Sequence, residues 1–189
     1  IEHPRGLFTR LAYRVARRQF GKVITPLKVI YARKPVLALA AQVLTWITEK
    51  GLTLDPDLRL LVTVHVARLN GCAFCQDLNI ARAMQEKIGL ERFQALPDYR
   101  TSDLFTERER VALAFAEEAT QEKKVSDSTF EALRARFSEK EIVELTWVNA
   151  AENYYNLQAA VLGIGSDGLA KAGGSRDRSR RAARASGRV

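Results

Sequence analysis

The sequence predicts an all-α fold, a single-domain helical bundle of about seven or eight helices that forms an oligomer. Ala and Leu are abundant, whereas Gly (11) and Pro (5) are few among the 189 residues, and this composition favours helix. Apolar residues recur at helical spacing along most of the chain, and no segment of useful length has the period of a strand. The apolar fraction of 47% is enough to bury one core.

Positive charge is concentrated at the two ends of the chain. Residues 1–34 carry nine Lys and Arg against one Glu, and residues 170–189 carry seven against one Asp. Residues 35–169 carry fourteen against twenty acidic residues, so the net charge of +8 does not describe a basic fold. We expect no specific nucleic-acid binding. These ranges predict a basic N-terminal helical arm, a helical domain and a disordered basic tail.

The first half of the chain predicts three helices. Residues 4–20 form a basic amphipathic helix, which we expect to pack on the domain or a neighbouring subunit rather than on a membrane. Residues 35–50 are apolar on nearly all sides, as in a helix buried in a core or an interface. That apolar run is too short to span a bilayer. The third helix follows the N-cap Asp55 and ends at about Asn70.

The second half predicts helices over about residues 72–87 and 90–96, and then three helices that begin with capping boxes. The boxes are Thr106-x-x-Glu109, Ser128-x-x-Glu131 and Ser138-x-x-Glu141. The last helix is long and apolar on most sides, so its polar residues need partners. Those residues are Asn149, Asn153 and Asn156, with Glu152 beside them. They could line a pocket, but we favour a structural role in which they satisfy loops or a neighbouring subunit.

The strongest functional signal is a C-x-x-C pair, Cys72 and Cys75, which are the only two cysteines. Asn70-Gly71 ends one helix, so the next begins at about Cys72 and the two thiols share a face. Their Cα atoms would lie roughly 5–6 Å apart, a distance that a disulfide accepts. A helix N-terminus also favours the thiolate. This arrangement suits a dithiol/disulfide couple.

His65 falls on the apolar stripe of the third helix. A histidine in this position is usually a hydrogen-bonded core residue, and a catalytic role is the lesser alternative. A metal site that joins His65 to the two cysteines is the least favoured reading, because a fourth ligand is not evident.

The chain resembles the carboxymuconolactone decarboxylase / alkylhydroperoxidase D-like family over roughly residues 35–169. The matching stretches are LRLLVTVHVARLNGCAFC (58–75), TERERVALAFAE (106–117) and FSEKEIVELT (137–146), and the stretch from NYYNL (153–157) to GSDG (165–168) is similar to one subgroup. The resemblance implies an all-helical fold that assembles as a trimer or hexamer. For the alkylhydroperoxidase branch it implies a cycling dithiol, without metal, haem or another cofactor.

In that branch a Glu on the preceding helix and a His four residues after the second Cys relay protons. This chain has Leu60 and Asn79 at those two positions. Asn79 can orient a thiol or a water molecule but cannot titrate near neutral pH. Either His65, Glu152 or Asp77 replaces the relay, or the thiols depend on the helix terminus alone, or the activity is weak or lost.

Three functions follow, and the first is favoured. It is a thiol-dependent peroxidase-like oxidoreductase, with Cys72, Cys75, His65, Asn79 and Glu152 as candidate site residues. Its partners would be a peroxide or other small-molecule oxidant and a dithiol reductant. The second is a decarboxylase-type enzyme acting on a small lactone acid, and the third is a non-catalytic oligomeric binding protein. A lone C-x-x-C without other cysteines indicates a reducing compartment, and we expect the cytoplasm.

Overall fold

The computed structural model describes residues 1–2, 6–86 and 88–171 of the chain. Within these ranges all regular structure is helical and no strand occurs, so the prediction of an all-α fold is confirmed. The α-helices are α1 (Leu7–Phe20), α2 (Pro35–Trp46), α3 (Pro56–Leu69), α4 (Ala73–Glu86), α5 (Leu90–Gln94), α6 (Glu107–Gln121), α7 (Asp127–Arg134) and α8 (Glu139–Val161). The predicted tail falls almost entirely on residues 172–189, outside the described part of the chain.

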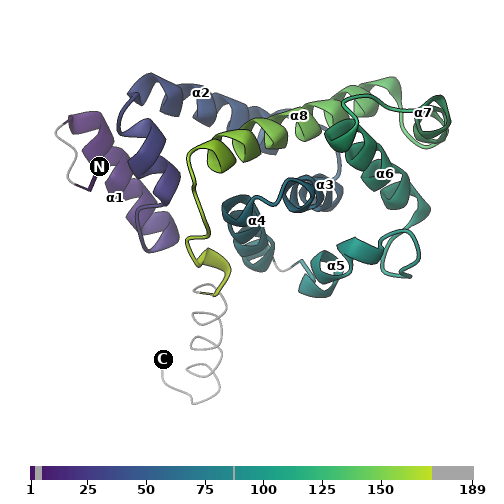
Figure 1. Cartoon of the computed structure of the whole chain (residues 1–189), viewed down its shortest axis with the longest axis horizontal. Helices are drawn as coiled ribbons and strands as arrows, with labels where there is room; N and C mark the ends of the chain where they lie inside the picture. Colours follow the sequence, from purple (N-terminus) through teal and green to yellow (C-terminus); the bar gives the residue numbers. More distant parts are fainter. Residues whose placement is uncertain (3–5, 87, 172–189) are drawn as a thin grey trace, which may run out of the picture.

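Helix α3 is central to the bundle and packs against α4, α6 and α8. Figure 1 shows the long helix α8 crossing the molecule, with α1 and α2 at one end and α6 and α7 at the other. Three α3 side chains, Leu61, Val62 and Val66, are wholly buried, as are Leu113 of α6 and Leu145 of α8. Burying such side chains stabilises each by about 1.5–3 kcal/mol, so these contacts fix α3 between its neighbours.

Three predicted helix starts are confirmed by their capping hydrogen bonds. The Asp55 side chain accepts hydrogen bonds from two backbone N–H groups, and Thr106 and Ser138 each form a reciprocal capping box. The prediction that Ser128 caps the short helix is wrong, because Ser126 is the N-cap of α7. The Glu118 carboxylate accepts hydrogen bonds from the Ser126 backbone N–H and hydroxyl, so a tertiary contact fixes the earlier serine.

Residues between α1 and α2 form a helical turn that the sequence did not predict, η1 (Leu27–Tyr31). Another turn, η2 (Ile47–Gly51), extends α2. Tyr13 of α1 packs in a small cluster with Val23 and Leu27. The N-terminal segment therefore has its own apolar cluster, and it reaches the bundle through Ile24, which also packs against the cluster of Phe74 and Ile164. In the part of the chain that is described, no helix is both long and apolar enough to cross a membrane.

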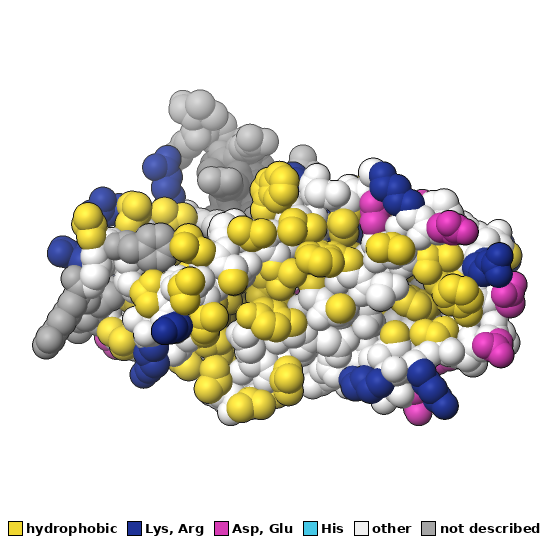
Figure 2. All heavy atoms as spheres, turned by 90° about the horizontal axis from the view of Figure 1, so that it is seen from above, with side chains coloured by type: hydrophobic (Ala, Val, Ile, Leu, Met, Phe, Trp, Pro, Cys, Tyr) yellow, Lys and Arg dark blue, Asp and Glu magenta, His cyan; other side chains and the backbone are white. Residues whose placement is uncertain are grey.

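Large apolar side chains remain exposed along α2 and α8. Figure 2 shows hydrophobic side chains spread over this face of the molecule. They include Val36, Leu39, Val43 and Trp46 on α2, and Val143, Leu157 and Val161 on α8. An apolar surface that is shared by two helices is typical of a protein–protein interface.

Candidate functional site

The turn before the cysteines is a Schellman motif that ends α3. Gly71 has a φ of 64°, and its N–H donates to the Arg68 carbonyl at 3.0 Å. The Cys72 N–H donates to the Ala67 carbonyl at 2.8 Å, which completes the motif. A left-handed φ favours glycine, because other residues meet a steric penalty there. The turn therefore fixes where Cys72 enters the next helix.

Cys72 occupies the N-cap position of α4. Its carbonyl accepts the Gln76 N–H at 3.0 Å, and its Sγ accepts the Cys75 N–H at 3.3 Å. Cys72 and Cys75 form a disulfide with a Cα–Cα distance of 5.3 Å, and both are buried. In the reduced state the same N–H group and helix terminus would favour the thiolate. The start of α4 is thus built for a dithiol/disulfide pair.

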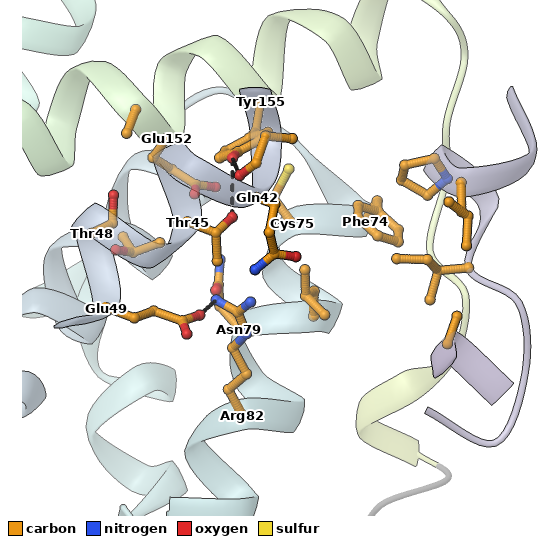
Figure 3. A pocket seen from close by; sticks show the side chains of 18 of the residues that line it. Gln42, Thr45, Thr48, Glu49, Phe74, Cys75, Asn79, Arg82, Glu152 and Tyr155 are labelled. Carbon is orange, nitrogen blue, oxygen red and sulfur yellow. Dashed lines mark hydrogen bonds and ion pairs between the residues drawn. The ribbon is translucent and has the colours of Figure 1, made fainter. Parts of the chain in front are cut away.

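One side of this pair opens into a pocket of about 750 Å³. Cys75 lines the pocket, and Cys72 is not among the lining residues. Figure 3 shows Cys75, Asn79 and Arg82 of α4 facing the space, with Glu152 reaching it from α8. Of the two sulfur atoms, Cys75 Sγ is therefore the one that a small molecule in the pocket would meet.

The pocket is polar on one side of Cys75 and apolar on the other (Figure 3). On the polar side, Arg82 pairs with Glu49 at 2.9 Å and the hydroxyls of Thr45 and Tyr155 lie 3.1 Å apart. The apolar side is formed by Phe74, by Ile24, and by Leu27 and Ile30 of η1. The disulfide thus lies at the boundary between a polar and an apolar lining.

Glu152 is the titratable group of the pocket nearest to neutral pH. Its side chain is buried, and burial raises its pKa from 4.5 to about 7, although hydrogen bonds from Asn156 and Asn79 and the charge of Arg82 act in the opposite direction. A carboxyl group with this pKa can both accept and donate a proton near pH 7. Leu60 also lines the pocket, so the position of the family's Glu is apolar here.

The asparagine row of α8 serves the protein interior. The Asn149 amide donates to the Ala116 carbonyl at 3.1 Å, and the Asn153 amide donates to the Thr120 hydroxyl at 3.2 Å. Asn156 donates to Glu152 Oε1 at 2.7 Å. None of the three asparagines lines the pocket. Asn149 and Asn153 thus have a structural role, whereas Asn156 contacts the buried carboxylate of Glu152.

His65 lies apart from the other candidate residues. Its ring is buried against Tyr99, with a centroid distance of 5.2 Å, and it does not line the pocket. Neither ring nitrogen forms a hydrogen bond, and Nε2 is 3.8 Å from a Glu117 oxygen. Burial lowers the pKa of His65 to about 4 against the opposing charge of Glu117. This histidine is neutral at physiological pH and belongs to the core.

Asp77 holds the end of the described chain against α4. Its carboxylate accepts hydrogen bonds from the Ser166 hydroxyl at 2.9 Å and from the backbone N–H groups of Leu169 and Ala170. Burial alone would raise its pKa, but these hydrogen bonds outweigh it and keep the pKa below its ordinary value. Asp77 is therefore an ionised anchor rather than a proton carrier.

Sequence reasoning missed Arg82, Glu49 and Thr45 as residues of the pocket. Arg82 could have been found, because it follows Cys75 and Asn79 at helical spacing on one face of α4. Thr45 and Glu49 reach the pocket through tertiary contacts, Thr45 with Tyr155 of α8 and Glu49 with Arg82 of α4, and no local signal marks those contacts. Among the described residues, no cluster of His, Cys, Asp and Glu could hold a metal ion.

Comparisons with known proteins agree with this fold. The profile of the carboxymuconolactone decarboxylase family matches residues 36–118. The uncharacterized protein YnjA of Escherichia coli (strain K12) is 29% identical over 157 residues, covering 82% of this chain and 86% of YnjA.

Several solved structures are similar, and two of them are the following. A protein of unknown function from Agrobacterium tumefaciens, provisionally assigned as antioxidant defence protein AhpD, has 26% identity and a TM-score of 0.68, covering 72% of this chain and 94% of its own. An uncharacterized peroxidase-related protein from Silicibacter sp. TM1040 has 22% identity and a TM-score of 0.77, covering 89% and 90%, and shares the fold. The chain is thus similar to the carboxymuconolactone decarboxylase family over residues 36–118, and it shares the fold of AhpD-like proteins.

Proposed function

We propose that the chain is a thiol-dependent peroxidase-like oxidoreductase in which Cys75 meets the peroxide and Cys72 resolves the product as a disulfide. The observation that carries this proposal is the shared pocket of Cys75 and Glu152. A nucleophilic thiol and a group able to move its proton are the two parts that the reaction needs. The provisional assignment of the A. tumefaciens relative to antioxidant defence supports the same chemistry.

In the first step the Cys75 thiol transfers its proton to the Glu152 carboxylate, and the thiolate attacks the nearer peroxide oxygen. The O–O bond breaks, and the departing alkoxide takes the proton from Glu152 and leaves as an alcohol. Cys75 becomes a sulfenic acid. Cys72 then attacks the Cys75 sulfur, and hydroxide departs with the Cys72 proton as water. Peroxide and two thiols are thus converted into alcohol, water and a disulfide.

Asn79 and Glu152 together take the place of the relay that the family places at Leu60 and Asn79. Asn79 lies one helical turn after Cys75, lines the same pocket as Glu152 and lowers the pKa of that carboxyl group, so it is coupled to the titrating group. The proton carrier then comes from α8 rather than from α3. An external dithiol would reduce the disulfide, as expected in the cytoplasm.

We also propose that the chain forms a homo-oligomer, a trimer or a hexamer, through the exposed apolar face of α2 and α8. Exposed apolar side chains of both helices are spread over this face (Figure 2). Burying it against a second copy would remove apolar area from water at about 25 cal/mol per Å².

The test of the peroxidase proposal is peroxide consumption by the purified protein with dithiothreitol as reductant. Cys75→Ser and Cys72→Ser should each abolish turnover, and Cys75→Ser should also prevent the first oxidation. Turnover of a lactone acid by both cysteine variants, with no peroxide consumption by the unaltered protein, would instead support the decarboxylase branch.

A further inference from the structure

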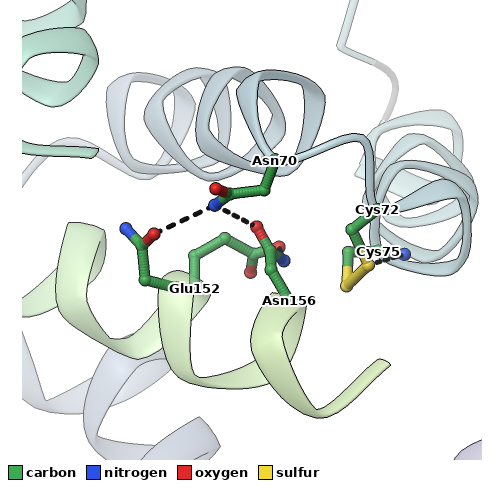
Figure 4. Close-up of a disulfide and its surroundings, with 6 residues drawn as sticks. Asn70, Cys72, Cys75, Glu152 and Asn156 are labelled. Atoms are coloured by element: carbon green, nitrogen blue, oxygen red, sulfur yellow. Dashed lines mark hydrogen bonds between the residues drawn. A yellow bond between two sulfur atoms is a disulfide. The ribbon is translucent and has the colours of Figure 1, made fainter. Parts of the chain in front are cut away.

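A chain of side-chain amides connects the interior of α8 to the cysteine turn and to Glu152 (Figure 4). The Asn153 amide donates to the Asn149 carbonyl at 2.9 Å, and the Asn70 amide donates to the side-chain oxygens of Asn153 and Asn156, each at 2.9 Å. Asn156 completes the chain with its 2.7 Å hydrogen bond to Glu152 Oε1. Asn156 and Glu152 are both buried.

The direction of this chain is fixed by backbone groups. A backbone carbonyl can only accept, so the Asn153 atom that faces the Asn149 carbonyl must be the NH₂ group. The Asn153 oxygen then faces Asn70, whose NH₂ group serves both neighbouring oxygens. The Asn156 oxygen is thereby occupied, and its NH₂ group is turned toward Glu152. The Glu152 carboxylate therefore faces the NH₂ group of Asn156, and the amide cannot flip to present its oxygen instead.

The same chain starts from the turn that places the cysteines. Asn70 is the C-cap of α3 and immediately precedes Gly71 and Cys72. Its amide is thus part of the turn that positions the disulfide, while its hydrogen bonds reach α8. A change in the cysteine turn would move the partner that orients Asn156.

We infer that Asn156 is a positioning residue that orients Glu152 for proton transfer and couples it to the cysteine turn through Asn70. This inference rests on the proposed function, in which Glu152 moves the proton of Cys75. The donor from Asn156 holds Oε1 in its unprotonated form, so the transferred proton is carried by the other oxygen of Glu152. Asn156 acts through Glu152 and does not line the pocket.

Arg82, Asn79 and Tyr155 are other polar residues around Glu152 in the pocket. Arg82 and Asn79 of α4 both lower the pKa of Glu152, and Arg82 is itself paired with Glu49 of η2. Tyr155 on α8 directs its hydroxyl to the Ala41 carbonyl at 3.0 Å. Removing the Asn156 donor therefore leaves Arg82 and Asn79 in place and should raise the pKa of Glu152.

The test uses Asn156→Leu, with Ser138→Ala as the matched control because it weakens the capping box at the far end of the same helix. The first readout is the carbon-13 titration of the Glu152 carboxyl signal, assigned with Glu152→Gln. The second is the pH profile of thiol oxidation in a single turnover with hydrogen peroxide. Asn70→Ala serves as a milder variant if Asn156→Leu does not fold.

In Asn156→Leu we expect the Glu152 midpoint to rise by about half a pH unit or more, with the corresponding limb of the rate profile following it. Asn70→Ala should move both in the same direction by less, and Ser138→Ala should leave both unchanged. An unchanged midpoint in both asparagine variants overturns the inference. Thiols of the unaltered protein that do not react with peroxide overturn the proposed function instead, and the carboxyl titration still decides whether Asn156 controls Glu152.

Discussion

Cys75 and Glu152 reach one pocket from two different helices, α4 and α8. Far apart in the sequence, they are brought together because α3 packs against both helices. In the proposed reaction this arrangement would give the Cys75 thiol a proton carrier that the adjacent α4 side chains do not supply.

Replacing Glu152 by Gln should slow the peroxide reaction without unfolding the protein. Positioned acid–base groups contribute about 100-fold or more to rate, so single-turnover thiol oxidation near pH 7 should fall by about that factor. Stopped-flow measurement of thiol loss checks this. A Glu152→Gln variant that reacts as fast as the unaltered protein would show that the proton moves by another route.

The same variant should be more stable than the unaltered protein at alkaline pH. Burial raises the pKa of Glu152 to about 7, so the folded state holds this proton more tightly than the unfolded state. Stability from this group is present below about pH 4.5 and is lost as pH rises through 7. Glu152→Gln cannot ionise, so its free energy of unfolding at pH 8 should exceed that of the unaltered protein by up to about 3 kcal/mol. Urea unfolding should show a difference in stability between the two proteins at pH 8 and none at pH 4.5. An equal difference at both pH values would contradict a raised pKa of Glu152.

His65→Leu should reduce sensitivity to acid while leaving peroxide reactivity within about twofold. Because the pKa of His65 is lowered to about 4, the unfolded state binds the proton more readily. The stability contributed by the neutral ring is present above pH 6.5 and is lost as pH falls toward 4. Thermal unfolding between pH 7 and pH 4 measures the difference. A folded His65→Leu variant without peroxide reactivity would show that His65 does take part in the reaction.

Installing the family's relay should raise the activity. Leu60 and Asn79 already line the pocket with Cys75, so Leu60→Glu with Asn79→His places two titratable groups in the same pocket as Cys75. We expect at least a severalfold faster thiol oxidation, since general acid–base groups act through proximity. Each single variant is the control. A folded double variant with an unchanged rate would mean that the relay argument does not apply to this scaffold.

A charge on the exposed apolar face should dissociate the oligomer. Trp46 is 60% exposed on α2, and Trp46→Glu would place a carboxylate in the proposed interface. Light scattering after size exclusion should show a trimer or hexamer for the unaltered protein and smaller species for the variant. Gln94→Glu, at an exposed position of α5, adds the same single negative charge away from this face and is the control. A monomeric unaltered protein would exclude the proposed interface.

Local signals predicted most of the fold. The caps at Asp55, Thr106 and Ser138 were readable because each side chain bonds a backbone group within a few residues. Ser126 was missed because its choice over Ser128 depends on Glu118, a contact from another helix.

The part of the site that lies on a single helix was also predictable from the sequence. Cys72, Cys75 and Asn79 share one helix face, which spacing alone reveals. The pairing of Asn79 with Glu152, and the separation of His65 from both, depend on how α3, α4 and α8 pack, and spacing does not determine that packing.

The most direct measurement of the central claim is a thiol titration of the reduced, folded protein before and after one equivalent of hydrogen peroxide. We expect both thiols to disappear together and to return with dithiothreitol, with a rate governed by a thiol pKa below about 7.5. Thiols that stay reduced in the folded protein and react only after unfolding would contradict the account, because Cys75 would then not be reached from the pocket.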